Sequence, residues 1–281
     1  MLIQSTQHAW RRAGVHVALL AFMAFLLFPL VWVFATSFKP TPEIYAGAGR
    51  LLPQQVSLEH YRAITTGSNL LLSMRNSLQA GLLATLLAVV LALPGAYALA
   101  RFRSALNQTI VGWILTSQIF PAILVMIPLY VLLRNLRLTD SLFGLALVYV
   151  VWALPFVLWM LHGYLKSIPV DLEEAAAIDG ATRPQIIFRV ILPTLLPALA
   201  AAMLFTFISA WNEFFFALVL MKSPDTVTLP VELARYTGME GQARTGPLAA
   251  ASVLATLPSL LLFGLLQKWF AGGLLAGAVK N

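Results

Sequence analysis

Six long stretches of the chain contain almost no charged residues, and they constrain the fold more than any other feature. A helix needs roughly 20 apolar residues to cross the hydrocarbon core of a bilayer, which is about 30 Å thick. The predicted spans cover approximately residues 14–38, 76–100, 107–133, 141–165, 190–220 and 246–268. We therefore predict an all-α integral membrane protein with six transmembrane helices, forming a single domain over residues 1–281.

The composition agrees with a membrane location. Of the 281 residues, 60% are hydrophobic and only 10% are charged, whereas soluble domains carry about 25% charged residues. A soluble fold could not solvate so much apolar surface. The first apolar stretch continues past Pro29 without a small-residue cleavage site, so we expect a true span there rather than a signal peptide.

The net charge of +7 does not indicate a nucleic-acid-binding protein. The basic residues lie in short segments between apolar runs, where they act as topological anchors, and they form no basic cluster. The chain has no cysteine and four scattered histidines, so no metal-ligand set is predicted. It also lacks the Gly-x-x-x-x-Gly-Lys-Ser/Thr string of a phosphate-binding loop. We expect no catalytic residue, no metal site and no cofactor in this chain.

The distribution of basic residues leaves the membrane orientation open. With both termini on one side, the 18 lysines and arginines divide equally between the two sides. The pairs Arg11–Arg12 and Arg101–Arg103 lie close to span ends, and they slightly favour a cytoplasmic position for the side that holds the termini.

The polar loop between the fourth and fifth spans, residues 166–189, predicts two short helices. Asp171, Glu173 and Glu174 are acidic residues of the kind that stabilise the positive end of a helix dipole. Ala175–Ala177 follow, and alanine is the strongest helix former. The first helix is therefore expected to begin near these carboxylates.

Gly180 fits the left-handed position that ends a helix. Thr182, three residues before Gln185, predicts a capping box that opens the second helix. The alanines allow close approach of a partner, and the carboxylates could meet arginines there. The residues alone fit a docking helix and a solvated connector equally well.

The string Glu174-Ala-Ala-Ala-Ile-Asp-Gly-Ala-Thr, followed by Leu192-Pro193, resembles the EAA loop of ABC importer permeases. The resemblance implies a type I ABC importer permease fold with a cytoplasmic EAA coupling helix between the fourth and fifth spans. It also implies that ATP is hydrolysed by separate ATPase subunits, so that this chain is not an enzyme. The residues expected to couple to the ATPase are Glu173, Glu174, Ala175, Ala176, Asp179 and Gly180.

Four further strings resemble one branch of that family, the carbohydrate-uptake permeases that are MalG-like. They are Phe34-Ala-Thr-Ser-Phe-Lys-Pro, Tyr97-Ala-Leu-Ala-Arg-Phe, Trp211-Asn-Glu-Phe and Ala276-Gly-Ala-Val-Lys. The resemblance covers essentially the whole chain and departs at Asn281, where relatives often have Gly. It implies a multi-pass protein of the bacterial or archaeal cytoplasmic (inner) membrane with both termini cytoplasmic.

The same resemblance implies a set of partners. They are a second, MalF-like permease subunit, two cytoplasmic ATPase subunits, an extracytoplasmic solute-binding protein and a sugar solute, with membrane lipid around the spans and no nucleic acid. One alternative is the same class of importer carrying a glycerol phosphate-type solute. Another is a secondary transporter, which also has several spans and an internal acid but does not need the EAA spacing.

The fifth span ends in a polar and aromatic string that predicts part of the translocation pathway, at Trp211, Asn212, Glu213 and Phe214. An ionisable residue inside a span is functional by default, because exposing it to lipid costs several kcal/mol. Aromatic faces and amide groups suit sugars, which present apolar C–H faces and hydroxyls. An internal ion pair or a hydrogen bond between helices is the alternative role for Glu213, and the sequence does not decide between them.

Overall fold

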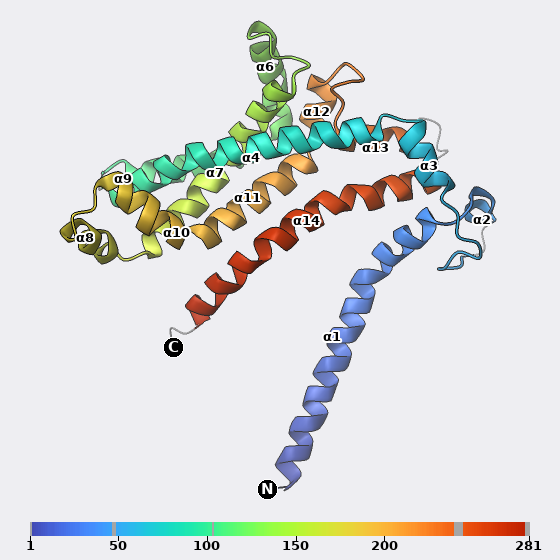
Figure 1. Cartoon of the computed structure of the whole chain (residues 1–281), viewed down its shortest axis with the longest axis horizontal. Helices are drawn as coiled ribbons and strands as arrows, with labels where there is room; N and C mark the ends of the chain where they lie inside the picture. The colour runs from blue at the N-terminus through green and yellow to red at the C-terminus, as the bar shows by residue number, and fades with distance from the viewer. Residues whose placement is uncertain (1, 47–48, 103, 239–243, 279–281) are drawn as a thin grey trace. The chain divides into compact units, whose positions relative to one another are not determined.

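The computed structural model describes residues 2–46, 49–102, 104–238 and 244–278. Every regular element in these ranges is a helix (Figure 1), so the all-α prediction is confirmed for this part of the chain. The chain forms two compact units. Unit 1 comprises residues 1–70 and 233–256, and unit 2 comprises residues 71–232 and 257–281.

Four helices are individually long and apolar enough to cross a membrane. They are α1 (Leu2–Ser37), α4 (Leu70–Arg101), α7 (Leu142–Ser167) and α14 (Thr245–Ala278). Each contains one internal proline and continues through it. A proline is tolerated within a membrane helix when neighbouring groups satisfy the carbonyl that it frees.

The other two predicted spans are broken. Helices α5 (Asn107–Ser117) and α6 (Ala122–Asn135) meet at 96°. The segment Arg183–Thr194 meets α11 (Leu196–Trp211) at 72°. Counting each bent pair as one span gives six spans, the predicted number, and counting only straight helices gives four.

Unit 1 contains three short elements beside the parts of the long helices that belong to it. They are α2 (Thr41–Tyr45), α3 (Glu59–Thr66) and the 3₁₀ turn η2 (Arg235–Thr237). The short helix α13 (Leu229–Ala234) precedes η2 in the chain.

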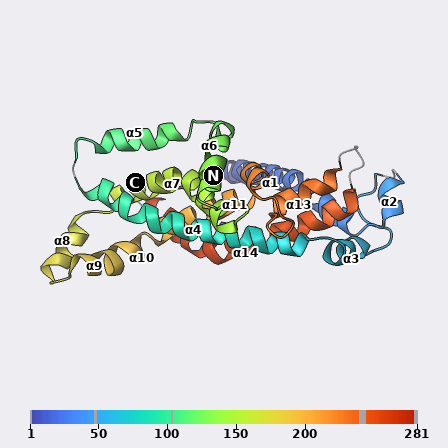
Figure 2. The same ribbon diagram turned by 90° about the horizontal axis from the view of Figure 1, so that it is seen from above.

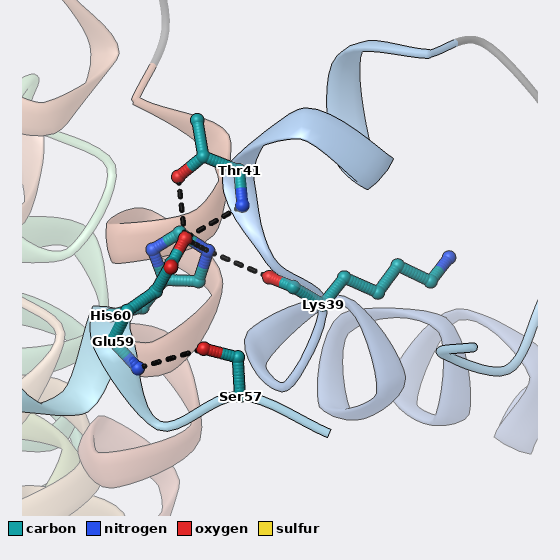
Figure 3. Close-up of polar contacts among 5 residues, drawn as sticks. All are labelled: Lys39, Thr41, Ser57, Glu59 and His60. Atoms are coloured by element: carbon teal, nitrogen blue, oxygen red, sulfur yellow. Dashed lines mark hydrogen bonds and ion pairs between the residues drawn. The ribbon is translucent and has the colours of Figure 1, made fainter. Parts of the chain in front are cut away.

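A polar cluster ties the start of α2 to α3 within unit 1 (Figure 3). The carboxylate of Glu59 accepts hydrogen bonds from the hydroxyl and the backbone N–H of Thr41, both at 2.6 Å. The ring of His60 is buried, and its Nε2 donates to the carbonyl of Lys39 at 2.9 Å. Gly246 packs against this ring so closely that an added Cβ would lie 2.1 Å from His60 Nε2.

The core of unit 2 is formed by α4, α7 and α11. Ala88, Ala92 and Ala96 recur every four residues along α4 and are fully buried, in one apolar cluster with Val157 and Leu161 of α7. Small side chains at this spacing let membrane helices approach closely, and packing replaces the hydrophobic effect as the source of stability there.

Three short helices lie at the C-terminal end of α4 (Figures 1 and 2). They are α8 (Asp171–Ile178), α9 (Arg183–Ile186) and α10 (Leu192–Thr194). They occupy the segment between α7 and α11, so the polar loop of the sequence projects from one end of the core of unit 2.

Asp140 joins two connections of unit 2, the one between α6 and α7 and the one after α12 (Phe215–Leu220). Its carboxylate accepts hydrogen bonds from the N–H groups of Lys222 at 2.8 Å and Ser223 at 3.1 Å. The hydroxyls of Ser223 and Thr226 donate to it as well. Asp140 itself has φ of 57°, in the left-handed region that Asp and Asn tolerate better than most residues.

Replacing Asp140 with alanine is expected to destabilise unit 2 by about 1–2 kcal/mol, because several charge-assisted hydrogen bonds are lost. Burial alone would raise the pKa of Asp140, but the hydrogen bonds from Ser223, Thr226 and the two N–H groups outweigh it and lower the pKa to about 2. The stabilisation is therefore complete above the ordinary pKa of 3.8 and is lost as the pH falls through about 2.

Thermal unfolding of the detergent-purified protein at neutral pH checks this prediction. The matched variant Asp140→Asn keeps an acceptor oxygen and the tolerance for a left-handed backbone, so its melting temperature should fall less than that of Asp140→Ala. Equal melting temperatures for wild type and Asp140→Ala would contradict the role given to the carboxylate.

Candidate functional site

The polar loop folds into two short helices, as its sequence predicts. Helix α8 is followed by Gly180, whose φ of 85° lies in the left-handed region. No atom lies within 4 Å of the place where a Cβ would stand on Gly180, so only its backbone conformation favours glycine there. Helix α9 then begins after Thr182, whose backbone N–H donates to Oε1 of Gln185 at 2.8 Å and so completes the capping box.

The chain between α9 and α11 remains helical but irregular. A π-helical turn, η1 (Ile187–Ile191), leads into α10. Such turns arise where a helix is interrupted, and here Leu192 and Pro193 follow directly. The loop therefore enters α11 through a bend rather than along a straight helix.

Helix α8 has two different faces. Glu173 and Ala176 are half-buried, and Ala176 packs on the apolar cluster of α4, α7 and α11. The exposed residues of α8 and its C-cap, which we call the outer face of α8, are Asp171, Leu172, Glu174, Ala175, Ala177, Ile178 and Asp179. The side chain of Ile178 is 86% exposed and that of Leu172 46%. Apolar groups gathered in this way on a short polar loop are typical of an interaction surface.

The predicted coupling residues are thus divided between the two faces. Glu174, Ala175 and Asp179 lie on the outer face, whereas Glu173 points inward. The carboxylate of Glu173 forms a salt bridge with Arg101 at 2.5 Å and accepts a hydrogen bond from the hydroxyl of Tyr97 at 2.7 Å. Both Tyr97 and Arg101 lie in the Tyr97-Ala-Leu-Ala-Arg-Phe string of the sequence analysis. The string does not show that they contact Glu173.

A cavity of about 360 Å³ lies between the break of the third predicted span and the end of α11, where α12 follows. Gln118 and Ala122 line it from the break between α5 and α6, and residues 212–216 line it from the break between α11 and α12. Tyr149 and Trp152 of α7 complete the wall. Non-helical backbone at membrane depth is tolerated only where it is buried in protein or lines a cavity. The cavity is therefore the candidate transport pathway within this chain.

Three of the four predicted pathway residues meet at this cavity. Asn212, Glu213 and Phe214 line it. Trp211 does not line it: its side chain is 4% exposed, and its ring stacks on Phe207 with centroids 5.7 Å apart. The structure gives Trp211 a packing position within α11.

Glu213 caps the N-terminus of α12. Its carboxylate accepts hydrogen bonds from the backbone N–H groups of Phe216 at 2.8 Å and Ala217 at 3.1 Å. Both salt bridges found among the described residues involve other carboxylates, those of Glu59 and Glu173, so no cation of this part of the chain pairs with Glu213. The sequence reasoning missed the capping role, although an acid close to the start of a helix is a known stabilising feature.

Comparison with known proteins agrees with this architecture. Residues 84–275 match the family model described as the binding-protein-dependent transport system inner membrane component. A putative ABC transporter permease protein of Streptomyces antibioticus is 49% identical over 82% of this chain and 100% of its own length. The diacetylchitobiose uptake system permease protein DasC of Streptomyces coelicolor is 37% identical over 91% of this chain and 92% of its own.

A solved structure has the same fold. A bacterial ABC transporter involved in the import of the acidic polysaccharide alginate contains a chain that superposes with a TM-score of 0.79 and 26% identity, over 92% of this chain and 97% of that one. The family match covers more than half of the residues. The chain therefore belongs to the binding-protein-dependent transport system inner membrane components, the multi-pass permeases of ABC importers.

Proposed function

We propose that this chain is a permease subunit of an ATP-driven importer of a sugar or oligosaccharide. The relatives described above support a carbohydrate, since one is named for diacetylchitobiose uptake and another for alginate import. The cavity supports it as well, because Trp152 and Phe205 offer aromatic faces beside the amide groups of Gln118 and Asn212. A glycerol phosphate-type solute fits less well, because the described lining contains the carboxylate of Glu213 and no lysine, arginine or histidine.

In this proposal α8 is the cytoplasmic coupling helix, and its outer face binds an ATPase subunit. The observation that carries the proposal is the exposure of Leu172 and Ile178 next to the carboxylate of Glu174, since an apolar centre with a charged rim is the usual composition of an interface. Closure of the ATPases would move α8 as a rigid body. The attached spans would then switch the pathway between inward-facing and outward-facing states.

The proposed assembly contains a second, MalF-like permease, two ATPase subunits that hydrolyse ATP, and an extracytoplasmic solute-binding protein. Both termini and the loop 166–189 are then cytoplasmic, and the connections 39–75 and 222–244 are external. The family description names a binding-protein-dependent system, which supports the last of these partners.

Single cysteines test the orientation and the docking surface together, because the chain has no native cysteine. Tyr45→Cys, at a side chain that is 65% exposed, should react with a membrane-impermeant thiol reagent from outside intact cells. Ile178→Cys should react only after permeabilisation, and in the assembled complex it should cross-link to the ATPase subunit. The reverse labelling pattern would overturn the orientation, and a cross-link that never forms would overturn the docking surface.

The solute class is tested with the complex reconstituted in proteoliposomes. Uptake of labelled mono- and disaccharides should depend on ATP and on the binding protein, whereas glycerol phosphate should not be taken up. Uptake of glycerol phosphate alone would favour the alternative solute.

A further inference from the structure

Arg101, the last residue of α4, reaches the coupling loop at two points. Its Nε donates to Oε1 of Glu173 at 2.5 Å, and its Nη2 donates to the carbonyl of Ile168 at 3.1 Å. Tyr97 lies one turn earlier on α4, and its hydroxyl donates to the other carboxylate oxygen, Oε2 of Glu173, at 2.7 Å. Both oxygens of Glu173 are therefore held by α4, through an arginine that is 72 residues away in the chain.

This contact is shielded from solvent. The side chains of Arg101 and Glu173 are only 10% and 11% exposed. The buried side chains of Leu165 and Ile168 belong to the apolar cluster beside it, against which Ala176 also packs. An exposed ion pair contributes little, because water and salt screen it, but a pair removed from solvent keeps most of its strength. The planar guanidinium also presents its donors in fixed directions, so it can hold two acceptors in one geometry as a lysine cannot.

The neighbouring carboxylate behaves differently. Glu174 is exposed on the outer face of α8, whereas Glu173 is turned toward α4. Helix α8 follows α7 and precedes α9 in the chain. The backbone connects it to α4 only through α5, α6 and α7. The side chains of Arg101 and Tyr97 supply a direct link.

We propose that Arg101 is a positioning residue that latches α8 to α4, so that Glu173 transmits movement inside this chain instead of contacting the ATPase. The inference rests on the proposed function, in which the ATPase moves α8. With the latch intact, a displacement of α8 carries α4 with it as well as α7 and α11. Without the latch, α8 still binds the ATPase through its outer face, but α4 no longer follows.

The test uses the complete importer in proteoliposomes with its binding protein, and it compares solute transported with ATP hydrolysed. Arg101→Lys and Glu173→Gln should lower the amount of solute moved per ATP by about tenfold, which is the size of effect expected when an element that couples two sites is loosened. ATP hydrolysis itself should persist in both variants. Tyr97→Phe removes one hydrogen bond and should give a smaller loss. Exchanging the two charges, with Arg101→Glu and Glu173→Arg in one chain, should restore part of the coupling.

Asp225→Asn is the control, since it removes one negative charge from an exposed side chain outside α8 and away from its outer face and should leave coupling unchanged. Wild-type coupling in Arg101→Lys and Glu173→Gln would overturn the latch. A second result would also overturn it: all three single variants give less assembled complex, but the complex that remains moves the wild-type amount of solute per ATP. The contact would then support folding only. The proposed function fails separately, when Ile178→Cys does not cross-link to the ATPase.

Discussion

Replacing Glu174 with lysine is expected to abolish solute uptake while the chain still folds and inserts. The side chain of Glu174 is exposed on the outer face of α8, so the change breaks no packing inside the chain. A cation in the first turn of a helix costs only about 0.3–1 kcal/mol through the helix dipole. A charge of the wrong sign within an interface costs several kcal/mol, and this repulsion should remove the ATPase from the complex.

Copurification of the ATPase subunit and uptake in proteoliposomes measure this outcome. Asp225→Lys is the matched control, because it reverses the charge of an exposed side chain in the connection 222–244, which we propose to be external. That variant should retain the ATPase at the wild-type level. Normal uptake by Glu174→Lys would remove the main support for α8 as the coupling helix.

Local signals were enough to predict the form of the polar loop between α7 and α11. Acidic residues followed by alanines give α8, the left-handed Gly180 ends it, and Thr182 with Gln185 opens α9. Each of these features depends on residues within one or two turns of one another. For that reason a single sequence is sufficient to predict them.

The inward orientation of Glu173 could not be predicted in this way. Glu173 and Glu174 are adjacent and chemically identical, and the resemblance implied that both meet the ATPase. Their difference depends on Arg101 and Tyr97, which the fold brings from the end of α4. A contact between residues so distant in the chain leaves no periodic pattern that a single sequence displays.

The interruptions of the third and fifth predicted spans were missed for a related reason. Both stretches are long and apolar, and length and hydropathy do not distinguish a straight helix from two that meet at 96° or 72°. Pro121 stands directly before α6 and Pro197 lies in the first turn of α11, but prolines within α4 and α7 do not end those helices. Whether a proline ends a helix depends on what the neighbouring helices offer to the freed carbonyl.

Replacing Glu213 with alanine is expected to lower the yield of assembled complex more than any other change at the cavity. The variant loses both hydrogen bonds that cap α12, and hydrogen bonds to a charged group contribute about 1.5–3 kcal/mol each. The N–H groups of Phe216 and Ala217 would be left unpaired in residues that are buried. The end of α12 should then unwind, and the break that shapes the cavity would lose its geometry.

Glu213→Gln separates this capping role from the two roles that the sequence left open. Glutamine keeps one acceptor oxygen and a similar shape, so a capping residue tolerates it, and the yield of Glu213→Gln should stay well above that of Glu213→Ala. An ion pair with a cation of the partner permease would make both variants equally poor in yield, because either change leaves that cation buried without a partner. Intact yield in both variants with impaired uptake would instead assign Glu213 to the solute pathway alone. Complex yield and uptake rate, measured side by side for the two variants, therefore distinguish the three roles of the one carboxylate that lines this cavity among the described residues.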